Sequence, residues 1–297
     1  MGVICILVAI GIFLHFRGVV DGLTSKKLSA IVVDVCNPAL IMASILSGHL
    51  TATHRDLIIA AGLGAAFYAL LVILGFILPR LLKVEPDKRK FYHLMVVYTN
   101  TGFLGLPVAR AVLPPNAILY VIVINVFYSL LFYTHGIAVL SGGREKVNIK
   151  KVLNPGTVMA VLSLVVFWFD ISLPPILGNT VEYVGNATVF LSMTLLGVSI
   201  ARSHLLDAVK EFRIWIYVLL RMIALPVGLV FLMRALGFSE EATLGICLMA
   251  AVPVGNLPMI QAEKTGEDTS ILASAIAVTT AVSIVTITLL MSIFAAG

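Results

Sequence analysis

Ten apolar segments follow one another along the chain and take up almost all of its 297 residues. A helix needs roughly 20 predominantly apolar residues to cross the hydrocarbon core of a bilayer. With 60% hydrophobic and 12% charged residues and a mean hydropathy of +1.07, the composition lies far outside the range of soluble domains. The sequence therefore predicts an all-α integral membrane protein with ten transmembrane helices and no soluble domain. The spans are expected at about residues 1–17, 27–48, 56–82, 91–113, 116–140, 154–170, 179–201, 212–235, 241–263 and 268–295.

Two of these segments are interrupted at their centres by Gly, Pro and Asn. The first break is Tyr98–Pro107, with the sequence YTNTGFLGLP, and the second is Ala251–Pro258, with the sequence AVPVGNLP. A broken helix leaves backbone groups unpaired in hydrocarbon, which is tolerated only where they line a cavity or meet a partner. A matched pair of breaks in two halves of a chain indicates the binding site of a transporter built from inverted repeats.

The repeat extends beyond the breaks. Residues 37–48 and 186–197 have the same length, and both stretches begin with Asn and end with Gly. A short charged connector at 141–153 divides the chain into two halves of five segments each. Because five is an odd number, the second half enters the membrane from the side opposite to the first. We therefore expect a first inverted repeat at 1–140 and a second at 154–297.

The distribution of basic residues predicts the orientation. Sixteen of the 20 Lys and Arg residues lie in the loops after segments 1, 3, 5, 7 and 9, whereas Arg55, Arg110 and Arg234 lie on the opposite side. Cytoplasmic loops collect Lys and Arg. Both termini are therefore expected outside, with the connector in the cytoplasm. The basic loops are expected to be solvated or to face lipid headgroups, and nucleic acid is not expected as a partner.

The inverted geometry predicts an anion site at the breaks. Pro107 and Pro258 are expected in the first turn of the second half-helices, where a missing N–H costs nothing. Two helix N-termini would then converge near the bilayer midplane, each with free N–H donors and about half a positive charge. Such a site binds an anion without any lysine or arginine.

The predicted substrate-binding residues lie at the two breaks, and the prolines there are expected to be architectural. An alternative for the two asparagines is that their side chains cap loose backbone. The predicted binding residues are Asn100, Thr101, Gly102, Gly105, Gly255 and Asn256, and the prolines are Pro107, Pro253 and Pro258. The three cysteines show no metal-type spacing, so no disulfide, metal or cofactor is expected.

Asp34 and Arg221 are the clearest charges inside predicted spans. An ionisable residue in a membrane is a functional candidate with a partner to be named, and similar depths allow these two to pair or to form a proton-sensitive coupling or gating contact. The alternative is that each side chain reaches the interface. Three histidines near helix ends are expected to pack at the interface: His15, His93 and His135.

Several of these motifs resemble those of the auxin efflux carrier family, which includes plant exporters of the PIN-formed type and bacterial malate or malonate permeases. The motifs are Asn-Pro-Ala-Leu at 37–40, Tyr-x-Asn-Thr-Gly-x-x-Gly-x-Pro at 98–107 and Pro-x-Gly-x-x-Pro at 253–258. The resemblance implies a crossover fold related to bile-acid symporters and sodium–proton antiporters. In that fold helices 1, 2, 6 and 7 form a scaffold, and helices 3–5 and 8–10 form a mobile transport domain.

The predicted function is a secondary carrier for small organic anions in the plasma membrane, with the carboxylate bound where helices 4 and 9 cross and moved by elevator-like alternating access. An anion channel and a sodium-coupled symporter of the same fold remain alternatives. No nucleophile–base constellation, phosphate loop or metal motif is present, so an enzyme is not expected. Malate, malonate, another dicarboxylate and an indole-type monocarboxylate remain open as substrates, and a homodimer remains open as the assembly.

Overall fold

The structure is a computed structural model that describes residues 2–46, 50–143, 152–203 and 209–294. Within these residues the chain is all-helical, apart from one isolated antiparallel bridge between Thr99 and Val254. Six helices are long and apolar enough to cross a membrane, and three shorter apolar helices accompany them. The six long helices are Gly22–Leu46, His54–Leu81, Ala117–Ser141, Pro175–Arg202, Phe212–Ala235 and Ser270–Phe294. The predicted all-α integral membrane class is therefore confirmed.

Each of the ten predicted apolar segments is helical, and the bounds differ by a few residues because polar side chains cap the ends. The second segment begins at Gly22, ahead of its apolar run, because the Asp21 carboxylate accepts a hydrogen bond from the backbone N–H of Thr24 at 2.7 Å. The first half contains α1 (Gly2–Phe16), α2 (Gly22–Ile31), α3 (Asn37–Leu46), α4 (His54–Leu81), α5 (Arg89–Val97), α6 (Leu106–Val112), α7 (Ala117–Leu131) and α8 (Ile137–Ser141).

The second half repeats the pattern of long, short and broken helices. It contains α9 (Pro155–Trp168), α10 (Pro175–Arg202), α12 (Phe212–Tyr217), α13 (Leu225–Ala235), α14 (Glu240–Ala251), α15 (Asn256–Lys264) and α16 (Ser270–Phe294). The connector predicted at 141–153 lies for the most part outside the described residues, which omit 144–151.

Among the described residues, four π-helical turns join some of these pieces into longer helices. They are Val32–Cys36 between α2 and α3, Thr101–Gly105 before α6, Phe132–Gly136 between α7 and α8, and Val218–Ala224 between α12 and α13. In this wider turn the backbone hydrogen bonds run between residues i and i+5, and such turns are frequent at functional sites.

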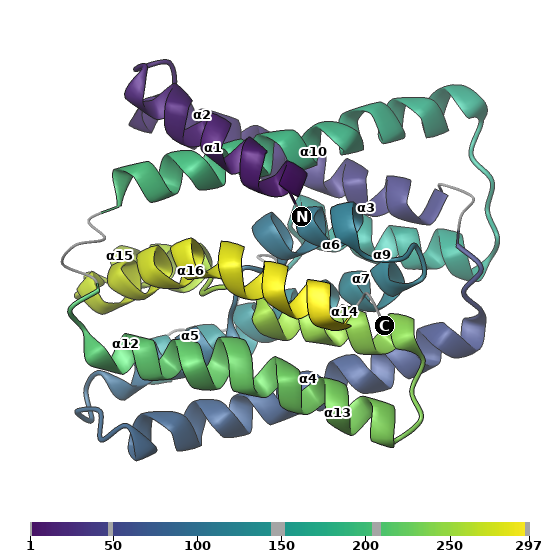
Figure 1. Cartoon of the computed structure of the whole chain (residues 1–297). Helices are drawn as coiled ribbons and strands as arrows, with labels where there is room; N and C mark the ends of the chain where they lie inside the picture. Colours follow the sequence, from purple (N-terminus) through teal and green to yellow (C-terminus); the bar gives the residue numbers. More distant parts are fainter. Residues whose placement is uncertain (1, 47–49, 144–151, 204–208, 295–297) are drawn as a thin grey trace.

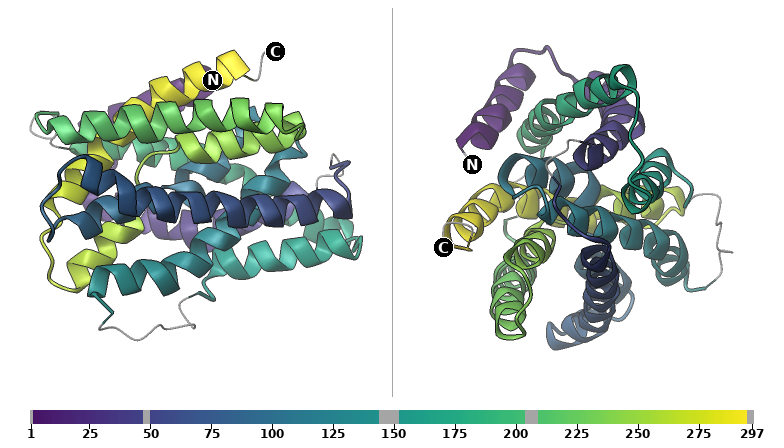
Figure 2. Two further views of the ribbon diagram at one scale, coloured as in Figure 1. Left: turned by 90° about the horizontal axis from the view of Figure 1, so that it is seen from below. Right: turned by 90° about the vertical axis from the view of Figure 1, so that its right-hand side faces the viewer.

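The interrupted helices form the centre of the molecule. Residues 91–97 of α5 and 242–251 of α14 are buried on all sides, as are residues 117–124 of α7. Helix α10 packs against α1 and α3, α3 packs against α9, and α7 and α13 both pack against α14 (Figure 1). The end-on view in Figure 2 shows the outer helices surrounding this centre.

Apolar side chains also point outward from the outer helices. Phe13 of α1, Ile58 of α4 and Phe231 of α13 are each at least 60% exposed. In water such a surface would be a liability, whereas in a bilayer these side chains meet lipid tails. The outer surface is therefore consistent with the membrane class.

Candidate functional site

The two helix breaks lie against each other. The backbone N–H of Asn100 donates to the carbonyl of Pro253 at 2.8 Å, and the N–H of Gly255 donates to the carbonyl of Tyr98 at 3.1 Å. The approach is so close that a Cβ atom at Gly255 would lie 3.0 Å from the Tyr98 carbonyl oxygen. These bonds satisfy backbone groups that the breaks remove from helical pairing, as hydrocarbon surroundings require.

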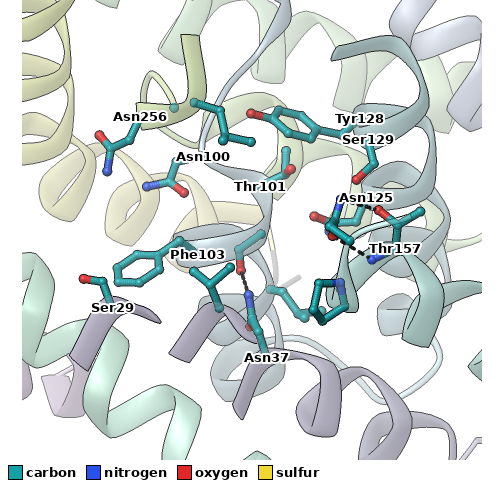
Figure 3. Close-up of a pocket in the computed structure, with 18 of the residues that line it drawn as sticks. Ser29, Asn37, Asn100, Thr101, Phe103, Asn125, Tyr128, Ser129, Thr157 and Asn256 are labelled. Atoms are coloured by element: carbon teal, nitrogen blue, oxygen red, sulfur yellow. Dashed lines mark hydrogen bonds between the residues drawn. The ribbon is translucent and has the colours of Figure 1, made fainter. Parts of the chain in front are cut away.

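A cavity of about 540 Å³ lies beside the breaks, a size typical of small-molecule sites. Its walls come from both breaks and from α2, α3, α7, α9, α10 and α15, and many of the polar side chains point inward (Figure 3). The only charged side chain among the lining residues is Asp34, so the polar surface of the cavity consists mainly of amides, hydroxyls and backbone.

Both second half-helices begin at this cavity without a side-chain cap. Their first N–H groups have no partner within the helix, and the lining includes Gly102 and Phe103 of one start and Asn256 and Leu257 of the other. The positive ends of two helix dipoles therefore meet at the cavity.

The two prolines do not occupy equivalent positions. Pro258 lies in the first turn of α15, as expected. Pro107 lies in the first turn of α6, also as expected, but the π-helical turn Thr101–Gly105 precedes α6, so helical backbone begins before this proline. The helix starts earlier because the carbonyl of Asn100 accepts from the N–H of Gly105 at 2.9 Å.

Pro107 nevertheless has a structural consequence at the cavity. In a π-helical turn the N–H of residue 107 would bond to the carbonyl of Gly102, and proline has no N–H. The side-chain amide of Asn37 donates to this free carbonyl at 2.8 Å, which ties α3 to the break (Figure 3). The Asn37 Oδ1 atom is buried without a hydrogen bond. Asn37 is not among the predicted site residues, although an Asn before a Pro inside an apolar segment is a signal that could have indicated it.

The cavity brings together five of the six predicted binding residues: Asn100, Thr101, Gly102, Gly255 and Asn256. In the described structure the side chains of Asn100 and Asn256 neither cap a helix nor make a hydrogen bond. The alternative that they cap loose backbone is therefore not observed. The Thr101 hydroxyl has no hydrogen-bond partner among the described residues, but it is itself fully buried. The side-chain amides of Asn100 and Asn256 are therefore the polar groups of the breaks that are accessible to a ligand.

The sixth predicted binding residue, Gly105, does not line the cavity. A Cβ at this position would lie 2.8 Å from the Cε atom of Met249, so the glycine allows close packing on α14. The predicted prolines are also absent from the lining, and the carbonyl of Pro253 accepts the bond from Asn100.

Several lining residues were not singled out from the sequence. Asn125, Tyr128 and Ser129 of α7 and Thr157 of α9 contribute further polar groups to the cavity wall (Figure 3). Each lies in an apolar run, and an isolated polar residue there gives no indication of which neighbour it faces.

Arg221 binds the C-terminal ends of α5 and α14, the half-helices that precede the two breaks. Its side chain is 2% exposed, its Nε–H donates to the carbonyl of Val96 at 2.9 Å, and an Nη1–H donates to the carbonyl of Ala250. These carbonyls lie in the last turns of α5 and α14, where each dipole places about half a negative charge. One guanidinium thus neutralises both negative ends, while both positive ends face the cavity.

The predicted contact between Asp34 and Arg221 is not present in this structure. Asp34 lines the cavity, and the hydrogen-bond acceptors of Arg221 are backbone carbonyls. Both residues do lie in π-helical turns. Their coupling in another conformation stays a prediction.

The chain matches a family of known proteins along nearly its whole length. Residues 1–149 and 143–291 match the family model described as membrane transport protein. An uncharacterized transporter of Methanocaldococcus jannaschii is 25% identical over 300 residues, which cover 97% of this chain and 95% of that protein. An uncharacterized transporter of Methanothermobacter thermautotrophicus is 25% identical over 297 residues, which cover 96% of this chain and 94% of that protein. The chain therefore belongs to the membrane transport protein family, the auxin efflux and PIN-like family that its motifs resemble.

Proposed function

We propose that the protein is a secondary carrier that moves small organic anions, with a carboxylate bound at the two helix breaks. The observation that carries this proposal is the pair of uncapped helix starts facing one cavity. Free N–H groups and the positive ends of two dipoles attract an anion. The neighbouring amides of Asn100 and Asn256 add donors without adding charge (Figure 3).

We further propose ten spans in two inverted repeats, with broken helices that cross at the midplane. The alternation of long, short and broken helices in both halves supports this topology. The packing of α1, α3, α9 and α10 with one another supports a scaffold, around which the remaining helices would move as a transport domain. Movement of that domain as a body would carry the site across the membrane in an elevator-like manner.

The shape of the cavity favours a carrier over a channel. Most lining residues come from the breaks and from the helix halves that lead to the Lys- and Arg-rich loops. On the other side of the breaks, Val108 and Ala109 of α6 and Leu248 and Met249 of α14 are buried in close packing. A cavity open on one side fits alternating access, and saturable flux with counter-exchange would distinguish a carrier from a channel.

The lining favours an anionic substrate with a polar body over a purely apolar one. Hydroxyls and amides line the cavity beside the helix starts, and the one lining carboxylate, that of Asp34, belongs to the π-helical turn Val32–Cys36. A carboxylate at the cavity can also act as a ligand for a cation, which keeps the sodium-coupled symporter as the alternative.

Replacement of Asn100 by Ala is expected to weaken carboxylate binding while the protein stays folded. The side chain lines the cavity and makes no hydrogen bond to any residue that the structure describes, so its loss removes a ligand contact and not a structural one. A charge-assisted hydrogen bond contributes about 1.5–3 kcal/mol, which corresponds to roughly ten- to hundredfold in affinity.

The measurement is the thermal shift of the purified protein with malate, malonate, succinate and indole-3-acetate. Asn179→Ala is the matched control, because Asn179 is an exposed residue of α10 outside the cavity. Equal shifts for the Asn100 variant and the wild type would remove Asn100 from the site, and no shift with any carboxylate would count against an anion carrier.

The proposed orientation predicts opposite labelling of two loops. Cysteines introduced at Lys88 and Ser172 should react with an impermeant maleimide from the cytoplasmic and the outer side, respectively. Both positions are exposed, and a Cys5→Ser background removes the exposed native thiol. Labelling of the Lys88→Cys variant in intact cells would reverse the proposed orientation, which follows the positive-inside rule.

A further inference from the structure

Two histidines lie together in the interior, away from the cavity. His93 of α5 and His135 of the π-helical turn Phe132–Gly136 have ring centroids 5.0 Å apart. His93 is 3% exposed and His135 is half-buried. The His93 side chain is enclosed by α4, α5 and the π-helical turn, and the packing of the two histidines at the membrane interface stays a prediction.

This pair contains unpaired polar atoms. Both ring nitrogens of His93 and the Nε2 atom of His135 are buried without a hydrogen bond. The large majority of buried polar atoms in proteins are hydrogen-bonded, and an exception requires an explanation. Here three unpaired nitrogen atoms belong to two neighbouring side chains.

The surrounding chain provides a fitted space for the His93 ring. A Cβ at Gly75 of α4 would lie 2.8 Å from the His93 Nδ1 atom, so any larger residue would displace the imidazole. The ring of Phe76 covers it with a centroid distance of 4.4 Å. An apolar side chain of the same size would fit this space without unpaired nitrogens, so packing alone does not explain an imidazole here.

Tyr98 links His135 to the break. Its hydroxyl donates to the carbonyl of Leu131 at 2.9 Å and lies 2.8 Å from the Nδ1 atom of His135. Because the single phenolic proton is used at Leu131, His135 donates from Nδ1, which leaves a lone pair on Nε2. The backbone carbonyl of Tyr98 accepts the bond from Gly255 that joins the two breaks.

We propose that His93 and His135 form a binding site for one proton, and that Tyr98 couples this site to the contact between the two breaks. A proton on the Nε2 atom of His135 turns a lone pair into a donor, and the neighbouring His93 ring, whose centroid lies 5.0 Å away, carries two nitrogens without a partner. Sharing of this proton between the two rings would pair two of the three unpaired atoms. The resulting charge strengthens the bond from Nδ1–H to Tyr98, since charge-assisted hydrogen bonds are shorter and stronger.

The groups that face the pair limit it to a single proton. They are Arg80 from α4 and Tyr98 from the end of α5, and among the described residues no carboxylate faces either imidazole. A second proton would be repelled by the first and by Arg80. The pair is thus expected to titrate as one unit with one proton, not as two separate histidines.

Histidine ¹⁵N NMR of the full-length protein in lipid nanodiscs, from about pH 4 to about pH 8, tests the site without any knowledge of the substrate. In the wild type, two imidazoles should respond to pH together and take up one proton between them. His93→Gln and His135→Gln assign the signals, and each should abolish the shared response. His54→Gln is the control, because His54 stacks on Trp168 with a centroid distance of 4.5 Å, outside the cluster.

Independent titration of the two imidazoles, or no proton uptake by either over this range, would overturn the proposed site. The wild-type titration decides this point even where a variant fails to fold.

Tyr98→Phe tests the coupling separately from proton binding. Maleimide modifies the thiolate, so its rate rises with pH at any cysteine. The rate at a cysteine introduced at Ser129, which lines the cavity, is therefore divided by the rate at a cysteine introduced at the exposed Ser172. In an otherwise wild-type background this ratio should change over the pH range in which the histidine pair takes up its proton. In Tyr98→Phe the NMR titration should persist, and the change in the ratio should be lost. If the ratio keeps its wild-type pH dependence in the Phe variant, the link through Tyr98 is wrong.

Discussion

Arg221→Gln is expected to destabilise the folded protein by about 3–6 kcal/mol. The wild-type guanidinium makes two hydrogen bonds, to the carbonyls of Val96 and Ala250. Each bond to a charged group contributes about 1.5–3 kcal/mol, and both carbonyls remain buried when the arginine is removed. The unfolding transition in detergent, followed by heat or by denaturant, measures the loss.

The geometry of the guanidinium matters as well as its charge. Its planar fork reaches two carbonyls on different helices, which the compact ammonium group of lysine does not reproduce. Arg221→Lys is therefore expected to recover only part of the lost stability. It should also weaken binding of the carboxylates tested above, because the two helix starts at the cavity depend on the alignment of α5 and α14 behind them.

Arg213→Gln is the matched control, since Arg213 lies on the same long helix and pairs with Glu211 at the surface. An exposed ion pair contributes about 0–1 kcal/mol. Equal destabilisation by the Arg221 and Arg213 variants would show that the interior contacts of Arg221 contribute little.

Gly197→Ala is expected to destabilise the protein by about 3 kcal/mol or more. At this point α10 touches α1 backbone to backbone, and a Cβ on Gly197 would lie 2.0 Å from the carbonyl oxygen of Val8. Overpacking usually costs about 1–3 kcal/mol. The cost here lies at or above the upper end of this range, because a carbonyl cannot rotate away as a side chain can.

Gly11 faces the same contact from α1, where a Cβ would lie 2.0 Å from the carbonyl oxygen of Thr194. Gly11→Ala should therefore destabilise to a similar extent, and the double variant should be less than additive because both changes separate the same two helices. Gly178→Ala on α10 is the control, because a Cβ there meets nothing within 4 Å. It should be neutral or gain up to about 1 kcal/mol from helix propensity. Melting temperatures that fall equally for Gly197→Ala and Gly178→Ala would contradict a close helix contact.

Much of the fold follows from local sequence. Apolar runs predicted each helical segment, because in hydrocarbon a chain satisfies its backbone within its own helix. The breaks were also readable, since Gly, Asn and Pro in the middle of such a run interrupt helical pairing. Asn100 and Asn256 were predicted at the cavity for this reason, and both line it.

Only the tertiary structure decided which groups meet. Asp34 and Arg221 were predicted to be functionally coupled, since their similar depths allow them to pair, whereas the hydrogen-bond acceptors of Arg221 in this structure are the carbonyls of Val96 and Ala250. Every residue carries a carbonyl, so a backbone acceptor leaves no signal in the sequence. The same holds for the bond from Asn37 to the carbonyl of Gly102.

The interior histidines show the same limit. His93 and His135 stand far apart in the chain and close to helix ends, which predicts interfacial packing, and only the folding of α5 against α4 and the helix that contains His135 encloses them. Local sequence thus determined where helices form and where they break, because backbone pairing in a membrane is a local requirement. The partners of the buried charge and of the buried imidazoles were decided by long-range packing, which brings together groups that have no fixed spacing along the chain.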